Sequence, residues 1–191
     1  MAGSAAGSNT RGTRTVTINR APVLTLWAAV VAERLGYDRD EALTLGQAVA
    51  GMNAAAKARA IGKFHPPQKP AAAAPRPRKV GETFDVPLCN RMVPAIHTPQ
   101  GLRALNKGTP AKPESVSRYL ESKFGDALSD ARGAMKALAL SVAKDELEAT
   151  AFSLYEAFRP AIPAGTRGWG AKGVLDLAQV RALAAKGRGR P

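Results

Sequence analysis

The chain has 191 residues, of which 45% are hydrophobic, so it can bury a core and lacks the composition of a disordered protein. Its formal net charge of +13 at pH 7 predicts a polyanionic partner: nucleic acid, an acidic membrane surface or a ribosome. Cys89 is the only cysteine, which excludes a disulfide within the chain and a cysteine-based zinc site, and favours a reducing compartment.

The positive charge is concentrated in three segments. Residues 1–20 contribute +3, residues 65–81 contribute +4 and residues 161–191 contribute +5, which together make +12 of the +13. Residues 114–160 are instead mildly acidic, with eight acidic residues against six basic ones. This distribution is typical of flexible arms that grip phosphates around a nearly neutral body; the alternative is that the charge serves solubility alone. We expect residues 1–20 to be such an arm, although RTVTINR could add a short strand.

Two helices make up the predicted N-terminal module, residues 21–64. Pro22 lies in the first turn of a helix, where proline is tolerated, and apolar residues recur after it as one stripe at i, i+3, i+4 and i+7. Gly36 ends this helix. Asp38, with Glu41 three residues later, predicts a capping box for the second helix.

The second helix raises the question of DNA binding. Residues 29–52 resemble a helix-turn-helix in shape, with small and apolar residues at the spacings that such a motif needs around its turn. The second helix opens with acidic residues, which would repel phosphates where a recognition helix usually enters the groove. Contact with DNA is therefore expected at its far end, which carries Lys57, Arg59 and Lys63. The alternative is a simple antiparallel helix pair in a core.

A linker and a hairpin follow. HPPQKPAAAAPRPRK has five prolines in fifteen residues, which favours extended polyproline II structure, so we interpret residues 65–81 as a semi-rigid basic linker. ETFDVPL then alternates with the period of a strand, and MVPAIHT could return as its hairpin partner across CNR. Pro87 and Pro94 place both strands at an edge or in a wing. By the order of its elements, 82–124 resembles a winged arrangement with Arg91 at the turn.

More helices are predicted after the hairpin. Pro113 begins a helix that Gly125 ends, and a long helical pattern then covers residues 126–158, with a break near 141–145 left open. A short last helix starts at Asp176.

The sequence therefore predicts a mainly α fold with a small β-hairpin, an α+β fold, in two compact pieces. The second piece, residues 82–186, holds the hairpin and the long C-terminal helices, and residues 187–191 form a basic tail.

RGWGAKG, residues 167–173, has the G-x-G-x-x-G spacing of a dinucleotide-binding turn. Such a fingerprint lies between a buried strand and a helix and needs an acidic residue about 20 positions later. Here two prolines precede it and only 18 residues follow Gly173. We interpret the segment as a Gly-rich turn that lets Trp169 pack against the long helix. In the functional alternative, Arg167 and Lys172 face phosphate from the same turn.

The sequence offers little support for catalysis. Neither His65 nor His97 has a metal partner at helical or hairpin spacing. Arg91 could lower the pKa of Cys89, but a lone buried thiol in a strand is commoner. We therefore predict no enzyme activity, no cofactor and no metal.

We predict a non-enzymatic nucleic-acid-binding protein of a bacterial-type cytoplasm or nucleoid. It prefers duplex DNA, held through phosphates with weak sequence specificity. The alternatives are an RNA- or ribosome-associated basic protein, and a helical adaptor that docks a protein partner or forms a homodimer. Ten aromatic residues are few for stacking on single strands, and the longest apolar run, 12 residues, is too short to span a bilayer. The residues predicted to contact nucleic acid are Arg11, Arg14, Arg20, Lys57, Arg59, Lys63, Arg76, Arg78, Lys79, Arg91, Arg167, Lys172, Arg188 and Arg190.

Overall fold

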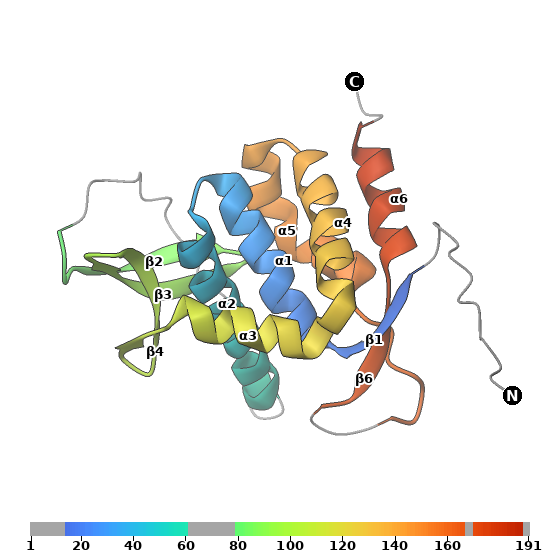
Figure 1. Cartoon of the computed structure of the whole chain (residues 1–191), viewed down its shortest axis with the longest axis horizontal. Coiled ribbons are helices and arrows are strands. Elements are labelled where there is room, and N and C mark those ends of the chain that lie inside the picture. Colours follow the sequence, from blue (N-terminus) through green and yellow to red (C-terminus); the bar gives the residue numbers. More distant parts are fainter. Residues whose placement is uncertain (1–13, 61–78, 167–169, 189–191) are drawn as a thin grey trace, which may run out of the picture.

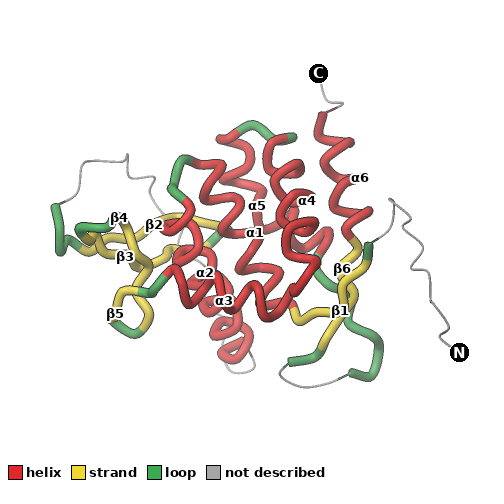
Figure 2. Tube along the Cα trace, in the orientation of Figure 1, coloured by secondary structure: helices red, strands yellow, loops and turns green. Residues whose placement is uncertain are grey.

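The structure is a computed structural model that describes residues 14–60, 79–166 and 170–188. Its helices are α1 (Arg20–Leu35), α2 (Arg39–Ala60), α3 (Pro113–Phe124), α4 (Leu128–Leu140), α5 (Lys144–Phe158) and α6 (Leu177–Arg188). Its strands are β1 (Thr15–Asn19), β2 (Thr83–Leu88), β3 (Arg91–Thr98), β4 (Gly101–Asn106), β5 (Thr109–Pro110) and β6 (Lys172–Asp176). Figure 2 shows the helices in the middle of the molecule and the strands at its two ends. The predicted α+β fold is confirmed.

Helix α1 lies at the centre of the molecule, between α2 on one side and α4 and α5 on the other, and α3 crosses near its lower end (Figure 1). Every side chain from residue 22 to residue 32 is buried. Trp27 donates its indole N–H to the carbonyl of Ala151 in α5 at 2.8 Å, and its ring meets Phe158 edge-on with the centroids 5.3 Å apart. The single apolar stripe predicted for this helix therefore understates its burial, because a helix that is apolar all round belongs inside a core.

Helix α2 packs antiparallel against α1. A Cβ added to Gly46 would lie 2.4 Å from the carbonyl oxygen of Thr25 and 2.8 Å from the amide nitrogen of Ala29. Gly46 is far along α2 from the turn at Gly36, so the two helices stay in close contact well away from that turn. This is the antiparallel pair of the alternative interpretation, and the resemblance to a helix-turn-helix is not confirmed.

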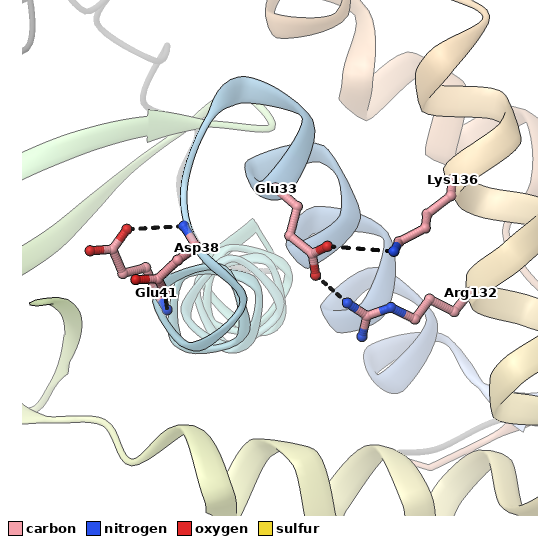
Figure 3. Close-up of polar contacts among 5 residues, drawn as sticks. All are labelled: Glu33, Asp38, Glu41, Arg132 and Lys136. Carbon is pink, nitrogen blue, oxygen red and sulfur yellow. Dashed lines mark hydrogen bonds and ion pairs between the residues drawn. The ribbon is translucent and has the colours of Figure 1, made fainter. Parts of the chain in front are cut away.

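The turn between α1 and α2 is built as the sequence predicts. Gly36 takes a φ of 114°, in the left-handed region, and ends α1. The N–H of Glu41 donates to the carboxylate of Asp38 at 2.9 Å, and the N–H of Asp38 donates to that of Glu41 at 3.2 Å (Figure 3). The capping box is confirmed. The other oxygen of Glu41 accepts the N–H of Leu102 at 3.0 Å, which ties the start of α2 to β4.

A cluster of charges links α1 to α4. The carboxylate of Glu33 in α1 pairs with Arg132 and, at 3.8 Å, with Lys136, both from α4 (Figure 3). Glu33 and Arg132 are each only 20% exposed, so solvent screens this pair less than a surface pair. These two cations of α4 are therefore engaged within the fold.

Strands β2 to β5 form an antiparallel sheet in the order β2-β3-β4-β5. The predicted hairpin is its β2–β3 pair, but Arg91, which was expected in the turn, is the first residue of β3 and lies opposite Leu88 across a two-residue turn. Cys89 and Asn90 in that turn have φ of 48° and 59°, as a type I′ hairpin turn requires. The sheet packs on α2 through β3 and β4, and the winged arrangement is not confirmed.

Residues 15–19, which we assigned to a flexible arm, form strand β1, the short strand that the sequence left open. It pairs antiparallel with β6, so that Asn19 lies opposite Lys172. The N-terminal segment up to residue 13 lies outside the described residues.

Strand β6 also explains part of the G-x-G-x-x-G pattern. A Cβ added to Gly173 would lie 2.7 Å from the carbonyl oxygen of Ala161, whose backbone bridges to Val174. A strand follows Gly170 where a dinucleotide site requires a helix. Gly173 therefore lets β6 lie close to the backbone of Ala161. Trp169, which was expected to pack against the long helix, lies outside the described residues.

The long helical pattern of residues 126–158 is divided into α4 and α5, at the break left open in the sequence. A Cβ on Gly187 of α6 would lie 2.6 Å from the hydroxyl of Ser141, so α6 packs closely at this break. The N–H of Ala178 donates to the carboxylate of Asp176 at 2.9 Å. The last helix therefore begins where the sequence predicts.

One hydrophobic core joins residues of both predicted modules. It includes Ile18, most of α1 and the inner face of α2, together with apolar residues of β2 to β4 and of α3 to α6. The linker falls largely in 61–78, outside the described residues, and the division into two modules stays a prediction.

Candidate functional site

A cleft of about 770 Å³ opens between the start of α1, the C-terminal half of α2, and α3. Three basic residues from these helices line it: Arg20 of α1, Lys57 of α2 and Lys123 of α3. The described residues that line it include no Asp or Glu. We call this site the basic cleft. Its volume is in the range of small-molecule binding sites.

Arg20 is partly buried and held in place by the fold. Its Nε–H donates to the carbonyl of Pro160 at 3.0 Å, and the hydroxyl of Tyr155 donates to its backbone carbonyl at 3.4 Å. Its two terminal nitrogens make no hydrogen bond to any other described residue. A guanidinium that is fixed in this way can bind an anion through two parallel hydrogen bonds.

Lys57 lies in a positive electrostatic environment. Partial burial lowers its pKa, the charges of Arg20 and Arg159 lower it further, and Glu156 acts in the opposite direction. Within the described part of the chain no carboxylate lies at ion-pair distance from its ammonium group. An anion in the cleft would offset this repulsion, so the electrostatics favour a negatively charged ligand.

Helix α3 supplies a cation and an aromatic ring to the same wall. Tyr119 and Lys123 are four residues apart and share one face of the helix, with the ammonium 5.9 Å from the ring centroid. Tyr155 of α5 also lines the cleft, and burial raises the pKa of its phenol to about 12. At pH 7 the cleft therefore presents cations and neutral hydroxyl groups.

Two more of the predicted residues lie beside the cleft without lining it. Arg91 donates to the side-chain oxygen of Asn53 at 3.3 Å, and Asn53 lines the cleft. Lys172 directly follows Ala171, which also lines it. Of the predicted residues, Arg20 and Lys57 therefore line the cleft, whereas Arg91 and Lys172 only neighbour residues that line it.

The remaining predicted residues lie elsewhere. Arg14 pairs with Asp130 of α4 at 2.6 Å, so its charge is already matched within the fold. Lys79 is exposed before β2, and Arg188 is exposed at the end of α6. Arg59 belongs to α2, but its side chain is outside the described part. Also outside it are Arg11, Lys63, Arg76, Arg78, Arg167 and Arg190.

Sequence reasoning missed Lys123, which lines the cleft, and Arg159, whose charge lowers the pKa of Lys57 although Arg159 does not line the cleft. Both lie in residues 114–160, where eight acidic residues outnumber six basic ones, so the net charge of the segment gave no sign of a basic site. The i, i+4 spacing of Tyr119 and Lys123 was the available signal, because it places both on one helix face.

A second cavity of about 610 Å³ lies between α2 and the sheet. Its α2 wall carries the small residues Ala48, Gly51 and Ala55, and its sheet wall includes Ala104 and Lys107.

The pKa of Cys89 is raised, whereas its sequence neighbour Arg91 suggested that it could be lowered. Its thiol is buried, and burial raises its pKa to about 12. Among the described residues, no group of three or more His, Cys, Asp or Glu could hold a metal ion, and no helix is long and apolar enough to cross a bilayer.

No protein-family model, curated protein or solved structure matches this chain.

Proposed function

We propose that this protein binds nucleic acid without catalysing a reaction, and that it contacts the phosphates of duplex DNA through the basic cleft. The observation that carries the proposal is the convergence of Arg20, Lys57 and Lys123, which are distant in sequence, on one cleft without an acidic residue among its described lining. Phosphates are the anions that clustered lysine and arginine neutralise in protein–DNA complexes.

The exposure of the side chains supports a polymer ligand. Lys57 and Lys123 are exposed at the rim of the cleft, where a DNA backbone can reach them. The charge of +13 would attract nucleic acid over longer range. Phosphate contacts do not read the base sequence, so we propose that binding has weak sequence specificity. A protein of this kind would act in the bacterial nucleoid.

Duplex DNA is preferred to single strands because few aromatic side chains are available for stacking. Trp27, Tyr155 and Phe158 are buried in the core, and Phe124 is nearly so. Single-strand recognition usually needs several exposed rings.

Fluorescence anisotropy tests the proposal with labelled duplex DNA, single-stranded DNA and RNA of matched length. We expect the duplex to bind most tightly and to lose orders of magnitude in affinity between roughly 50 and 200 mM salt. Absence of binding at low salt would contradict the proposal. Displacement of the duplex by an equal concentration of RNA would favour the RNA-associated alternative.

The cavity beside the sheet favours a second candidate function, that of a protein adaptor. Small residues along the α2 wall of this cavity would let a partner helix approach closely. Size-exclusion chromatography with light scattering tests self-association, and a strict monomer at high concentration would count against a homodimer.

A further inference from the structure

We propose that the basic cleft is a phosphomonoester pocket, which takes the terminal 5′-phosphate and first nucleotide of a DNA strand. This inference rests on the proposed function, and names the part of the nucleic acid that the cleft holds.

The size of the cleft limits what can enter it. A volume of about 770 Å³ suits a single small ligand, whereas a DNA duplex is too wide to enter and can reach only the exposed ammonium groups of Lys57 and Lys123 at the rim. The unit that fits is one nucleotide, and a strand end offers one at the cost of at most its own terminal base pair.

The charge of the cleft favours a terminal phosphate over an internal one. A phosphodiester carries a single negative charge, whereas a phosphomonoester carries about −1.5 to −2 at pH 7 and three terminal oxygens. Arg20, Lys57 and Lys123 supply three positive charges; at Lys57 the charge of Arg159 adds to this positive field and the carboxylate of Glu156 offsets part of it. The guanidinium can bind two oxygens side by side, which leaves the ammonium groups for the third.

The start of α1 adds to this preference. Arg20 and Ala21 of its first turn line the cleft, and the turn contains no acidic residue. Asn19 makes no side-chain cap and instead donates its amide to the carbonyl of Gly170. No acidic residue of the first turn therefore opposes the positive end of the helix dipole, which lies beside the cations that line the cleft.

The rest of the lining suits a sugar and a base. Pro22, Leu24 and Ile162 form apolar wall, and the partly exposed ring of Tyr119 offers a face for stacking. The cleft therefore combines a cationic part with an apolar and aromatic part, as a nucleotide requires.

The direct test compares two DNA hairpins of identical sequence, each with a label in the loop, one with a 5′-phosphate and the other with a 5′-hydroxyl. We expect the phosphorylated hairpin to bind the full-length protein about tenfold more tightly, because charged hydrogen bonds are added. The double variant Lys57→Gln/Lys123→Gln should lose this difference. The control Lys144→Gln/Lys186→Gln should keep it, since it removes the same charge from exposed positions that do not line the cleft.

A second measurement separates this inference from the proposed function. Calorimetric titration with adenosine 5′-monophosphate and with adenosine should show binding of the nucleotide alone, lost in the cleft variant. If both hairpins bind equally and the nucleotide does not bind, the pocket inference is wrong while DNA binding stands. If the nucleotide binds in the cleft but no DNA binds, the pocket is confirmed for free nucleotides and the proposed function is wrong. Circular dichroism on each variant checks that it is folded.

Discussion

Gly46 and Gly51 show, within one helix, what a missing side chain does for packing. A Cβ at Gly46 would collide with the backbone of α1, whereas nothing lies within 4 Å of a Cβ at Gly51. We expect Gly46→Ala to lower the free energy of unfolding by about 1–3 kcal/mol through overpacking. Gly51→Ala should raise it by about 0.5–1 kcal/mol, because alanine favours the helix. Urea unfolding followed by circular dichroism measures both, and a neutral Gly46→Ala would contradict the close approach.

Cys89 and Tyr155 make the stability of the fold sensitive to alkaline pH. Burial raises the pKa of Cys89 from 9.0 to about 12 and that of Tyr155 from 10.0 to about 12. The folded state therefore holds these protons more tightly than the unfolded state, and the resulting stabilisation is complete below pH 9. We expect the free energy of unfolding to fall as pH rises from about 9 towards 12.

The variant Cys89→Ala serves as the control for this effect. It should show a shallower fall over the same pH range, because one of the two titrating groups is gone. A wild-type stability that is flat from pH 9 to pH 11 would argue against burial of both groups.

At the scale of elements, three alanine substitutions at the start of α2 test the contribution of its capping box to stability. Asp38→Ala removes one cap and should lower the free energy of unfolding by about 1 kcal/mol. Glu41→Ala should cost more, because it also leaves the N–H of Leu102 without its acceptor. Asp40→Ala, in the same turn but outside the box, should cost only a few tenths of a kcal/mol. Thermal or urea unfolding measures the loss of stability for each variant. Equal losses for all three variants would contradict the link between Glu41 and β4.

The elements that could be predicted are those with local signals. Gly36 and the Asp38–Glu41 box mark the turn between α1 and α2, and Asp176 marks the start of α6. Strand β4 was missed because its alternation of apolar and polar residues covers only residues 102–104, and its burial follows from contact with α2. A sequence pattern predicts the helix or strand in which it lies. Which element packs against a given face of that helix or strand depends on how the whole chain folds.

At the scale of the whole molecule, the basic cleft shows the same limit. From the sequence, positive charge could be assigned to the arms and the linker, and Arg20 and Lys57 could be predicted as nucleic-acid contacts. It had no means to place them beside Lys123, because their meeting depends on how α1, α2 and α3 pack together. Charge density can be read along a chain, whereas convergence of charge is a property of tertiary structure.

The salt dependence of duplex binding tests the central claim most directly, that the cleft cations hold phosphates. The slope of log affinity against log salt is measured for the wild type, for Lys57→Gln/Lys123→Gln and for the control Lys144→Gln/Lys186→Gln. Each lost phosphate contact should reduce the slope by about 1, so the cleft variant should fall by about 2 and the control should match the wild type. Equal slopes for the wild type and the cleft variant would contradict the claim and move the phosphate contacts elsewhere on the protein.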